Sequence, residues 1–386
     1  MTGARPPHLL HVFPTFVAAG AQTRVVQLMA GFGDRFRHSV CALDGRTDAL
    51  ELVPEAVEAR AVEAPRARGP FAGVRGLRNL IAREAPELLL TYNWGSFDAV
   101  LAARSLGLSA HVHHEDGFNL DEAARQKTRR VLARRFGLRR AHRVIVPSRL
   151  LRSIALDVWR LPREQVELIS NGVHTDRFAP KAGDTAVRDR LGIPREAWVV
   201  GAVGHLRPVK CYGRLIAACA LLEPAVLAGR AVHVLLVGDG PERRKLEAQA
   251  GHHPPPGGRV HFAGHQDELA PWYRAMDVFA ISSDSEQQPV SLLEAMACGV
   301  PVAATDVGDV RAVLTGDGAR FLVPATGPRP ELGLARAIEA LLREPDLQRE
   351  LADAGRRRVE ESFSYEAMLA AYGTLYEGAL RASREA

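Results

Sequence analysis

The stretch SSDSEQQPVSLLEAMACGVPVAATDV, from Ser282 to Val307, is the most informative part of this chain. It places Glu286 before Pro289 and Glu294 after it, and it ends in an apolar strand. Proline suits the first turn of a helix, because the N–H that it lacks would have no partner there. The amides that follow it would favour an anion at the helix start. We expect the free amides to be those of Val290, Ser291 and Leu292, an arrangement typical of a sugar-nucleotide site.

Short apolar runs alternate with longer helical patterns on both sides of this stretch. Such runs are typical of buried parallel strands, and their alternation with helices predicts two doubly wound α/β sheets. Ligands of such sheets bind beyond the carboxyl ends of the strands. We place the domain boundary near residue 175, so that the domains cover residues 1–175 and 176–364, followed by a helix over 365–386. The expected strands are 9–14, 39–43, 87–92, 109–114 and 143–148, then 198–204, 233–240, 259–265, 277–282 and 301–306.

The composition excludes several classes of protein. With 386 residues, of which 47% are hydrophobic, the chain can bury the cores of two domains. No run of eighteen apolar residues is present, and the N-terminal apolar run is too short for a signal peptide. The four cysteines form no CxxC pair, which argues against a zinc knuckle or a disulfide framework. We therefore expect a cytoplasmic protein.

A basic run extends from Arg125 to Arg143, with apolar residues at helical spacing between the charges. One interpretation is peripheral contact with anionic lipid on the inner face of the membrane. We favour an amphipathic helix that packs on a sheet and exposes its arginines to solvent. Nucleic acid is not an expected partner, because Phe136 is the only aromatic residue of the run that could stack on a base and no recognised reading motif is present.

Several polar residues follow strands, where α/β proteins place their reacting groups. The first expected strand leads through a loop of small residues to Gly20, which would let a diphosphate approach the backbone. In the second half, Gly204 is followed by His205, Arg207 and Lys210, whose cations would neutralise a diphosphate leaving group. His114 ends another strand, before Glu115 and Asp116. No GxGxxG follows any strand, which argues against a dinucleotide-dependent dehydrogenase.

The segments AAGAQ, HHEDG, SNGV, AVGHLRPVK, VGDGPERRKLE, VHFAGH and EQQPVSLLEAMACGVPVAATDVG together resemble glycosyltransferase family 4. The resemblance covers nearly the whole chain in the expected order. It implies the GT-B architecture, two facing Rossmann-like domains with an interdomain cleft. The last helix, from about Tyr365, would cross back to the first domain. The resemblance also implies an enzyme of the hexosyltransferase class. Such an enzyme transfers a sugar from a nucleotide-sugar donor to an acceptor hydroxyl and retains the configuration at the anomeric carbon. We expect a UDP- or GDP-sugar as donor, no cofactor and no metal, and a role in polysaccharide, glycolipid or related biosynthesis.

The resemblance also implies a role for individual residues. Glu286 corresponds to the residue that meets the donor sugar, and Glu294 to the one that holds the ribose. Lys210 would meet the diphosphate, and His114 would meet the sugar. We expect Glu286, His114 and Lys210 to be the catalytic residues. The remaining donor contacts are assigned to Gly20 beside the diphosphate, to Gln287, to Gln288, Pro289, Val290 and Ser291 through their backbone, to Asn171 near the hinge, and to Gly264 and His265 beside the base.

Two positions depart from the family pattern. His205 stands after Gly204 where an arginine is usual, so either Arg207 supplies that charge or Lys210 acts alone. The usual E-G-x-P step reads Glu286, Gln287, Gln288, Pro289, which changes the surroundings of the sugar. These departures keep open a catalytically impaired nucleotide-sugar-binding protein, and a sugar-nucleotide epimerase of the same architecture is a second alternative. For the acceptor, we expect an opening lined by Tyr92, Asn93, Trp94 and the loop 115–121.

Overall fold

A computed structural model describes residues 5–66, 71–118, 122, 126–225 and 227–385. The contacts between residues divide the chain into two compact units. Unit 1 comprises Met1–Asn171 and Glu366–Ala386, and unit 2 comprises Gly172–Tyr365. The C-terminal segment thus belongs to the same unit as the N-terminal half of the chain. Within the described ranges, no helix is both long enough and apolar enough to span a bilayer.

Unit 1 is built on a seven-stranded parallel sheet with the order β3-β2-β1-β4-β5-β6-β7. All five strands expected here are present, and the short β3 and β7 were not expected. The strand order reverses between β1 and β4, which is where doubly wound sheets bind their ligands. The strands are β1 His8–Phe13, β2 Arg37–Ala42, β3 Ala59–Ala61, β4 Leu88–Tyr92, β5 His111–His114, β6 Arg143–Val146 and β7 Val166–Leu168.

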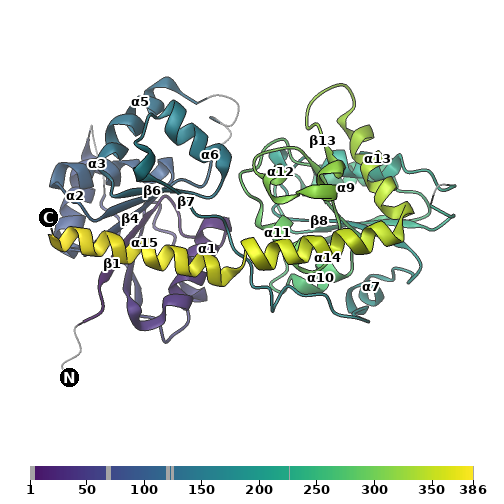
Figure 1. The fold of residues 1–386 in the computed structure, drawn as a ribbon, viewed down its shortest axis with the longest axis horizontal. Helices are drawn as coiled ribbons and strands as arrows, with labels where there is room; N and C mark the ends of the chain where they lie inside the picture. The colour runs from purple at the N-terminus through teal and green to yellow at the C-terminus, as the bar shows by residue number, and fades with distance from the viewer. Residues whose placement is uncertain (1–4, 67–70, 119–121, 123–125, 226, 386) are drawn as a thin grey trace. The chain divides into compact units, whose positions relative to one another are not determined.

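Helices cover the sheet of unit 1 (Figure 1). In α2 the buried residues Leu77, Leu80 and Ile81 follow helical spacing and pack with the sheet residues Leu10 and Val12. The helix that ends the chain, α15, packs on α1 and reaches β5 through its tyrosines. The principal helices are α1 Gly20–Phe32, α2 Ala72–Glu84, α3 Phe97–Leu106, α5 Thr128–Gly137, α6 Arg149–Ser153 and α15 Tyr365–Glu385.

Unit 2 has a six-stranded parallel sheet with the order β10-β9-β8-β11-β12-β13. The five expected strands are present, and the two-residue β13 was not expected. In β8, Val199 and Val203 belong to one apolar cluster, whereas Val200 and Ala202 belong to another. Both faces of the sheet are therefore buried, which explains the continuous apolar runs of the sequence. The strands are β8 Trp198–Val203, β9 Val232–Val237, β10 Val260–Gly264, β11 Val278–Ile281, β12 Val302–Thr305 and β13 Leu322–Val323.

The helices of unit 2 lie on both faces of its sheet. Leu292 of α11 and Val359 of α14 belong to one apolar cluster, while Leu215 of α8 and Leu341 of α13 belong to the other. The predicted class, two doubly wound Rossmann-like α/β units, is confirmed. The helices are α7 Ala186–Leu191, α8 Tyr212–Ala220, α9 Arg243–His252, α10 Ala270–Arg274, α11 Val290–Ala297, α12 Val310–Val313, α13 Pro330–Arg343 and α14 Pro345–Ser362.

The basic run forms a helix, but not the one that was expected. Arg125 lies outside the described residues, and α5 begins at Thr128. Arg134 is only 1% exposed and forms ion pairs with Glu115 and Glu122, and Arg130 also pairs with Glu122. The expectation of a solvated arginine face is therefore wrong for these two residues, because buried carboxylates meet them inside the unit.

Candidate functional site

The first part of the candidate site lies in unit 2, where the loops after β8 and β11 meet. The Nζ atom of Lys210 lies 2.7 Å from Oε1 of Glu286. Ser283 Oγ donates a hydrogen bond of 2.6 Å to the same carboxylate oxygen. The side chain of Glu286 is 11% exposed and that of Lys210 is 23% exposed. The structure thus brings together two of the three residues predicted to be catalytic, and adds Ser283, which the sequence did not single out.

The backbone on both sides fixes the position of Lys210. This residue ends a single 3₁₀ turn, Pro208–Lys210. Ser282 Oγ donates a hydrogen bond of 2.9 Å to the Lys210 carbonyl, and the amide of Asp284 donates one of 2.9 Å to the carbonyl of Val209. A small cavity of about 10 Å³ beside the pair is lined by Lys210, Tyr212, Ser283, Glu286 and Ser291, among others. Ser291 lies in the first turn of α11, so the start of this helix borders the ion pair.

Helix α11 begins at Val290, and Pro289 is its N-cap with an extended backbone, φ −69° and ψ 119°. Pro289 therefore stands one position before the helical turn in which it was expected. The amide of Leu292 donates to the carbonyl of Pro289 at 3.1 Å, so the prediction that this amide is free was wrong. Val290 and Ser291 are left as the candidate anion donors at this helix start.

Gly308 supports the loop that carries Glu286, and the sequence did not single it out. Its φ is +55°, and a Cβ added there would lie 2.2 Å from the carbonyl O of Glu286 and 2.7 Å from that of Gln287. The next residue, Asp309, donates its amide to the Gln287 carbonyl at 2.8 Å. A glycine three residues beyond the end of β12 is a signal that could have indicated such a close approach.

The second glutamate, Glu294, lies in the middle of α11. The hydroxyl of Tyr273 in α10 donates to its Oε2 at 2.6 Å. Burial raises the pKa of Glu294, whereas the hydrogen bond from Tyr273 lowers it, and burial has the larger effect. Burial next to this carboxylate also raises the pKa of Tyr273 well above its usual value. The carboxylate is thus oriented by a phenol that the sequence did not connect with it.

The glycine-rich loops after β8, β9 and β10 lie against one another. A Cβ on Gly238 would lie 2.2 Å from the carbonyl of Gly204, and one on Gly240 would lie 2.7 Å from Leu206. The amide of Gly238 donates to the carbonyl of Gly264 at 2.8 Å. The two glycines of the VGDG segment therefore allow close packing of backbone. Three donor-contact candidates on these loops, His205, Arg207 and His265, are exposed.

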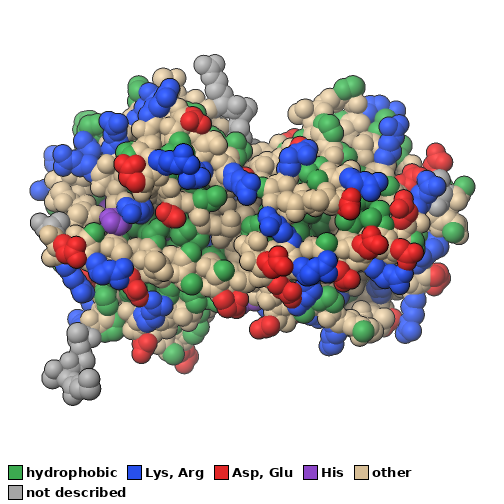
Figure 2. All heavy atoms as spheres, viewed as in Figure 1, with side chains coloured by type: hydrophobic (Ala, Val, Ile, Leu, Met, Phe, Trp, Pro, Cys, Tyr) green, Lys and Arg blue, Asp and Glu red, His purple; other side chains and the backbone are tan. Residues whose placement is uncertain are grey.

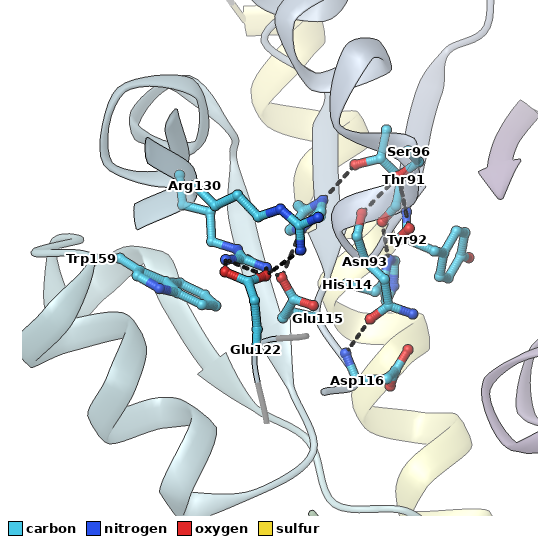
Figure 3. Close-up of polar contacts among 12 residues, drawn as sticks. Thr91, Tyr92, Asn93, Ser96, His114, Glu115, Asp116, Glu122, Arg130 and Trp159 are labelled. Carbon is cyan, nitrogen blue, oxygen red and sulfur yellow. Dashed lines mark hydrogen bonds and ion pairs between the residues drawn. The ribbon is translucent and has the colours of Figure 1, made fainter. Parts of the chain in front are cut away.

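In unit 1, the predicted sugar contact His114 is inside the fold (Figure 3). It is 1% exposed, its Nε2 lies 3.0 Å from the Tyr376 hydroxyl, and its Nδ1 lies 3.3 Å from the carbonyl O of Thr91. The ring of Tyr92 stacks on it at 4.4 Å. Burial, together with the charge of Arg24, lowers the pKa of His114 well below its usual value, so the ring is neutral. In this structure both ring nitrogens of His114 are engaged by its own unit.

An ion pair lies beside His114. Arg24 in α1 and Asp116 after β5 are 2.7 Å apart, and Arg24 also donates to Oδ1 of Asn171 at 3.0 Å. Burial alone would lower the pKa of Arg24, but the Asp116 carboxylate outweighs it and raises the pKa. The predicted donor contact Asn171 is thus bound to α1, the helix that Gly20 begins. A Cβ on Gly20 would meet nothing within 4 Å, so this helix start is open.

The expected acceptor opening is only partly described. Tyr92 is fully buried, so it does not line an opening, and this expectation was wrong. Asn93 turns its side-chain oxygen toward the amide of Asp116, at 2.7 Å (Figure 3). Residues 119–121 of the expected loop lie outside the described residues. Within the described part of the chain, no three His, Cys, Asp or Glu side chains are grouped as a metal site requires.

Curated proteins with similar sequences are glycosyltransferases. The chain is 33% identical over 236 residues to the D-inositol 3-phosphate glycosyltransferase of Streptomyces bingchenggensis (strain BCW-1), an alignment that covers 57% of this chain and 49% of that protein. It is 33% identical over 213 residues to the lipopolysaccharide core biosynthesis glycosyltransferase LpsE of Rhizobium meliloti (strain 1021), covering 54% of this chain and 57% of the relative. The chain spans about half the length of such relatives.

Solved structures with the same fold cover almost the whole chain. Sucrose-phosphate synthase (tll1590) from Thermosynechococcus elongatus superposes with a TM-score of 0.79 at 24% identity, over 97% of this chain and 100% of that one. Anabaena Alr3699/HepE in complex with UDP and glucose gives a TM-score of 0.77 at 19% identity, over 96% and 100%. At these identities the likeness establishes the fold alone.

Family descriptions match both halves of the chain. "Glycosyltransferase Family 4" matches residues 18–177, most of unit 1. "Glycosyl transferases group 1" matches residues 197–344, which include Lys210, Glu286 and Glu294. The resemblance read from the sequence motifs is thus confirmed over both units, and the chain belongs to glycosyltransferase family 4, the group 1 glycosyl transferases with the GT-B fold.

Proposed function

We propose that this protein transfers a sugar from a nucleotide-sugar donor to an acceptor hydroxyl, with retention of configuration at the anomeric carbon and without a metal ion. The observation that carries the proposal is the pairing of Lys210 with Glu286 next to the first turn of α11. A fixed cation, a helix start and a carboxylate are the groups that departure of a diphosphate from a sugar requires. Negative charge develops on the departing oxygen and positive charge on the sugar ring.

Donor binding would exchange the partners of this ion pair. The diphosphate takes Lys210 from Glu286 and binds the amides at the start of α11, because it carries more negative charge than one carboxylate and can accept from both donors at once. Glu286, released from Lys210 but still held by Ser283, then accepts hydrogen bonds from the sugar hydroxyls. The charged groups needed in the transition state are thus in place before the donor arrives, which is the basis of electrostatic preorganisation.

The other assignments complete the proposal. Glu294, oriented by Tyr273, binds the ribose, and Gly264 with His265 borders the base. Gly20 lies beside the diphosphate, and Arg207 supplies a second charge in place of His205. His114 meets the donor sugar, for which one of the hydrogen bonds that its ring nitrogens now make with Thr91 and Tyr376 must be exchanged. Backbone groups from Gln287 to Ser291 contact the sugar.

We propose a UDP- or GDP-hexose as donor and a hydroxyl of a glycoconjugate precursor as acceptor. Support for the base comes from the Anabaena protein of the same fold, which was solved with UDP and glucose. Support for the acceptor class comes from relatives named for inositol phosphate and lipopolysaccharide core. The four free cysteines are in keeping with the proposed cytoplasmic location.

Two measurements test the proposal. A thermal shift screen with UDP-, GDP-, ADP- and TDP-sugars should raise Tm for one base, because a ligand that binds only the folded state stabilises it. Release of the nucleoside diphosphate is then followed with that donor and a panel of acceptors. Glu286→Ala should abolish release of the nucleoside diphosphate without changing Tm. Glu361→Ala, which removes an exposed carboxylate on α14, should leave this release unchanged. Donor binding without turnover by the unaltered protein would instead support a nucleotide-sugar-binding protein.

A further inference from the structure

Helix α5 of unit 1 buries arginine side chains and exposes large apolar ones, although its Val131 and Ala133 pack on the apolar core in the usual way. Its buried face carries Arg130 and Arg134, whereas its outer face carries Leu132 and Phe136. Leu132 is 56% exposed and Phe136 is 59% exposed. A surface helix normally turns its apolar stripe to the core and its charges to water. This arrangement therefore needs a physical reason on each face.

The inner face is stable because its charges are neutralised. Arg134 Nε lies 3.2 Å from Glu115 Oε2, and its Nη2 lies 3.3 Å from Glu122 Oε2. Arg130 lies 2.8 Å from the same oxygen of Glu122 (Figure 3). Burial alone would raise the pKa of Glu122, but the hydrogen bonds from Arg130, the amide of Lys127 and Arg134 lower it. Both guanidinium groups also lie over the ring of Trp94.

The outer face combines apolar and cationic side chains. Leu132 and Phe136 are one helical turn apart, and the guanidinium of Arg104 in α3 lies 3.9 Å from the centre of the Phe136 ring. Arg129, Arg139 and Arg140 are exposed around them, and the sequence from Gln126 to Arg143 contains no Asp or Glu. Figure 2 shows Lys and Arg side chains gathered, with apolar side chains between them, over the part of unit 1 where α5 lies. We call Arg129, Leu132, Phe136, Arg139 and Arg140 the α5 surface.

We propose that the α5 surface docks on a lipid bilayer with anionic headgroups. The arginines are attracted to the negative surface, and Leu132 and Phe136 enter the boundary between headgroups and acyl chains. Such a contact removes both side chains from water without spanning the membrane. This inference is independent of the proposed transfer reaction, since none of these residues belongs to the candidate donor site.

The charges of the α5 surface argue against a second copy of the chain as its occupant. A symmetric contact between two copies would bring the two sets of arginines opposite one another, which is unfavourable. An acidic bilayer matches the arginines and also accepts the apolar pair. Of these two occupants, only the bilayer is complementary to both the arginines and the apolar side chains.

Co-sedimentation of the full-length protein with vesicles tests the inference. The unaltered protein should bind vesicles of phosphatidylcholine with phosphatidylglycerol, should bind pure phosphatidylcholine more weakly, and should be released by high salt. The double variant Leu132→Ser/Phe136→Ser should lose about tenfold or more in binding. The double variant Arg139→Gln/Arg140→Gln should bind more weakly to the vesicles with phosphatidylglycerol, and its binding to pure phosphatidylcholine should not change. Leu52→Ser is the matched control, because Leu52 is 57% exposed in the same unit but lies outside α5. This variant should bind the vesicles as well as the unaltered protein does.

Each other outcome overturns the inference. If the unaltered protein stays in the supernatant at low salt, or if the double variant binds as well as the unaltered protein, the α5 surface does not dock on lipid. If light scattering shows a concentration-dependent dimer that the double variant abolishes, a second copy is the occupant. The melting temperature and the nucleotide release measured without vesicles should be the same in all variants, which separates docking from folding and from the donor site.

Discussion

The Nζ atom of Lys210 and the Oε1 atom of Glu286 lie 2.7 Å apart, although 76 positions separate the two residues in the chain. They meet because Lys210 follows β8 and Glu286 follows β11, and these two strands are neighbours in the sheet of unit 2. The carboxyl ends of neighbouring parallel strands bring their loops to the same edge. In this structure each residue neutralises the other. In the proposed reaction, the donor would therefore exchange one ion pair for another.

Lys210→Ala should lower kcat/KM for the nucleotide sugar by about a hundredfold, because the developing charge on the diphosphate loses its fixed cation. His205→Ala should lower it only a few-fold, since this exposed side chain lies on the same loop without the ion pair. Steady-state release of the nucleoside diphosphate measures both. Equal losses in the two variants would contradict the assignment of Lys210 to the phosphate.

Gly308→Ala should lower kcat/KM strongly, because its new methyl group would lie 2.2 Å from the carbonyl O of Glu286 and displace that residue. Gly316→Ala is the matched control. Gly316 has φ +58°, close to the +55° of Gly308, but a Cβ there would meet nothing within 4 Å. Both variants carry the same backbone strain, about 1 kcal/mol of stability, so only the contact differs. Activity lost equally in the two would show that strain alone is responsible.

Stability should fall as the pH is lowered from about 6.5 towards 4. Burial lowers the pKa of His38 to about 4 and that of His111 to about 3, both from an ordinary value of 6.5. In the second unit, burial and the neighbouring His233 lower the pKa of His261 to about 4. At a pH between the folded and unfolded pKa values of these histidines, the unfolded chain binds more protons than the folded chain. Their contribution to the free energy of unfolding is therefore complete above about pH 6.5 and is lost as the pH falls below that value.

Denaturant unfolding at several pH values between 8 and about 4 measures this dependence. His111→Gln, which removes the most strongly shifted of the three groups, should reduce the slope. The prediction is contradicted if the free energy of unfolding stays constant or increases when the pH is lowered from 7 to 5.

Arg134→Met should destabilise unit 1 by about 3–5 kcal/mol, because it leaves Glu115 and Glu122 buried without their cation. The exposed Arg129 on the same helix provides the control, and Arg129→Met should change stability by less than about 0.5 kcal/mol. Chemical denaturation gives both values. If the two variants unfold at the same denaturant concentration, the buried ion pairs do not hold α5 in its orientation.

The sequence alone determined the two parallel sheets and the position of Glu286 and Glu294 around Pro289. These features depend on local pattern: apolar runs of strand length, a helix that proline can introduce, and motif spacing that does not change on folding. For the same reason the sequence analysis missed the strands of two or three residues, since β3, β7 and β13 are too short to show a pattern.

Which side chains meet depends on the folded chain. Tyr273 reaches Glu294, Gly308 lies against Glu286, and His114 is enclosed by Tyr376 from the far end of the chain, at a separation of 262 residues. No local pattern carries such pairings, because they depend on how strands are ordered in a sheet. The orientation of α5 was mispredicted for this reason: a run of arginines indicates charge, but only the folded chain brings Glu115 and Glu122 close enough to bury it.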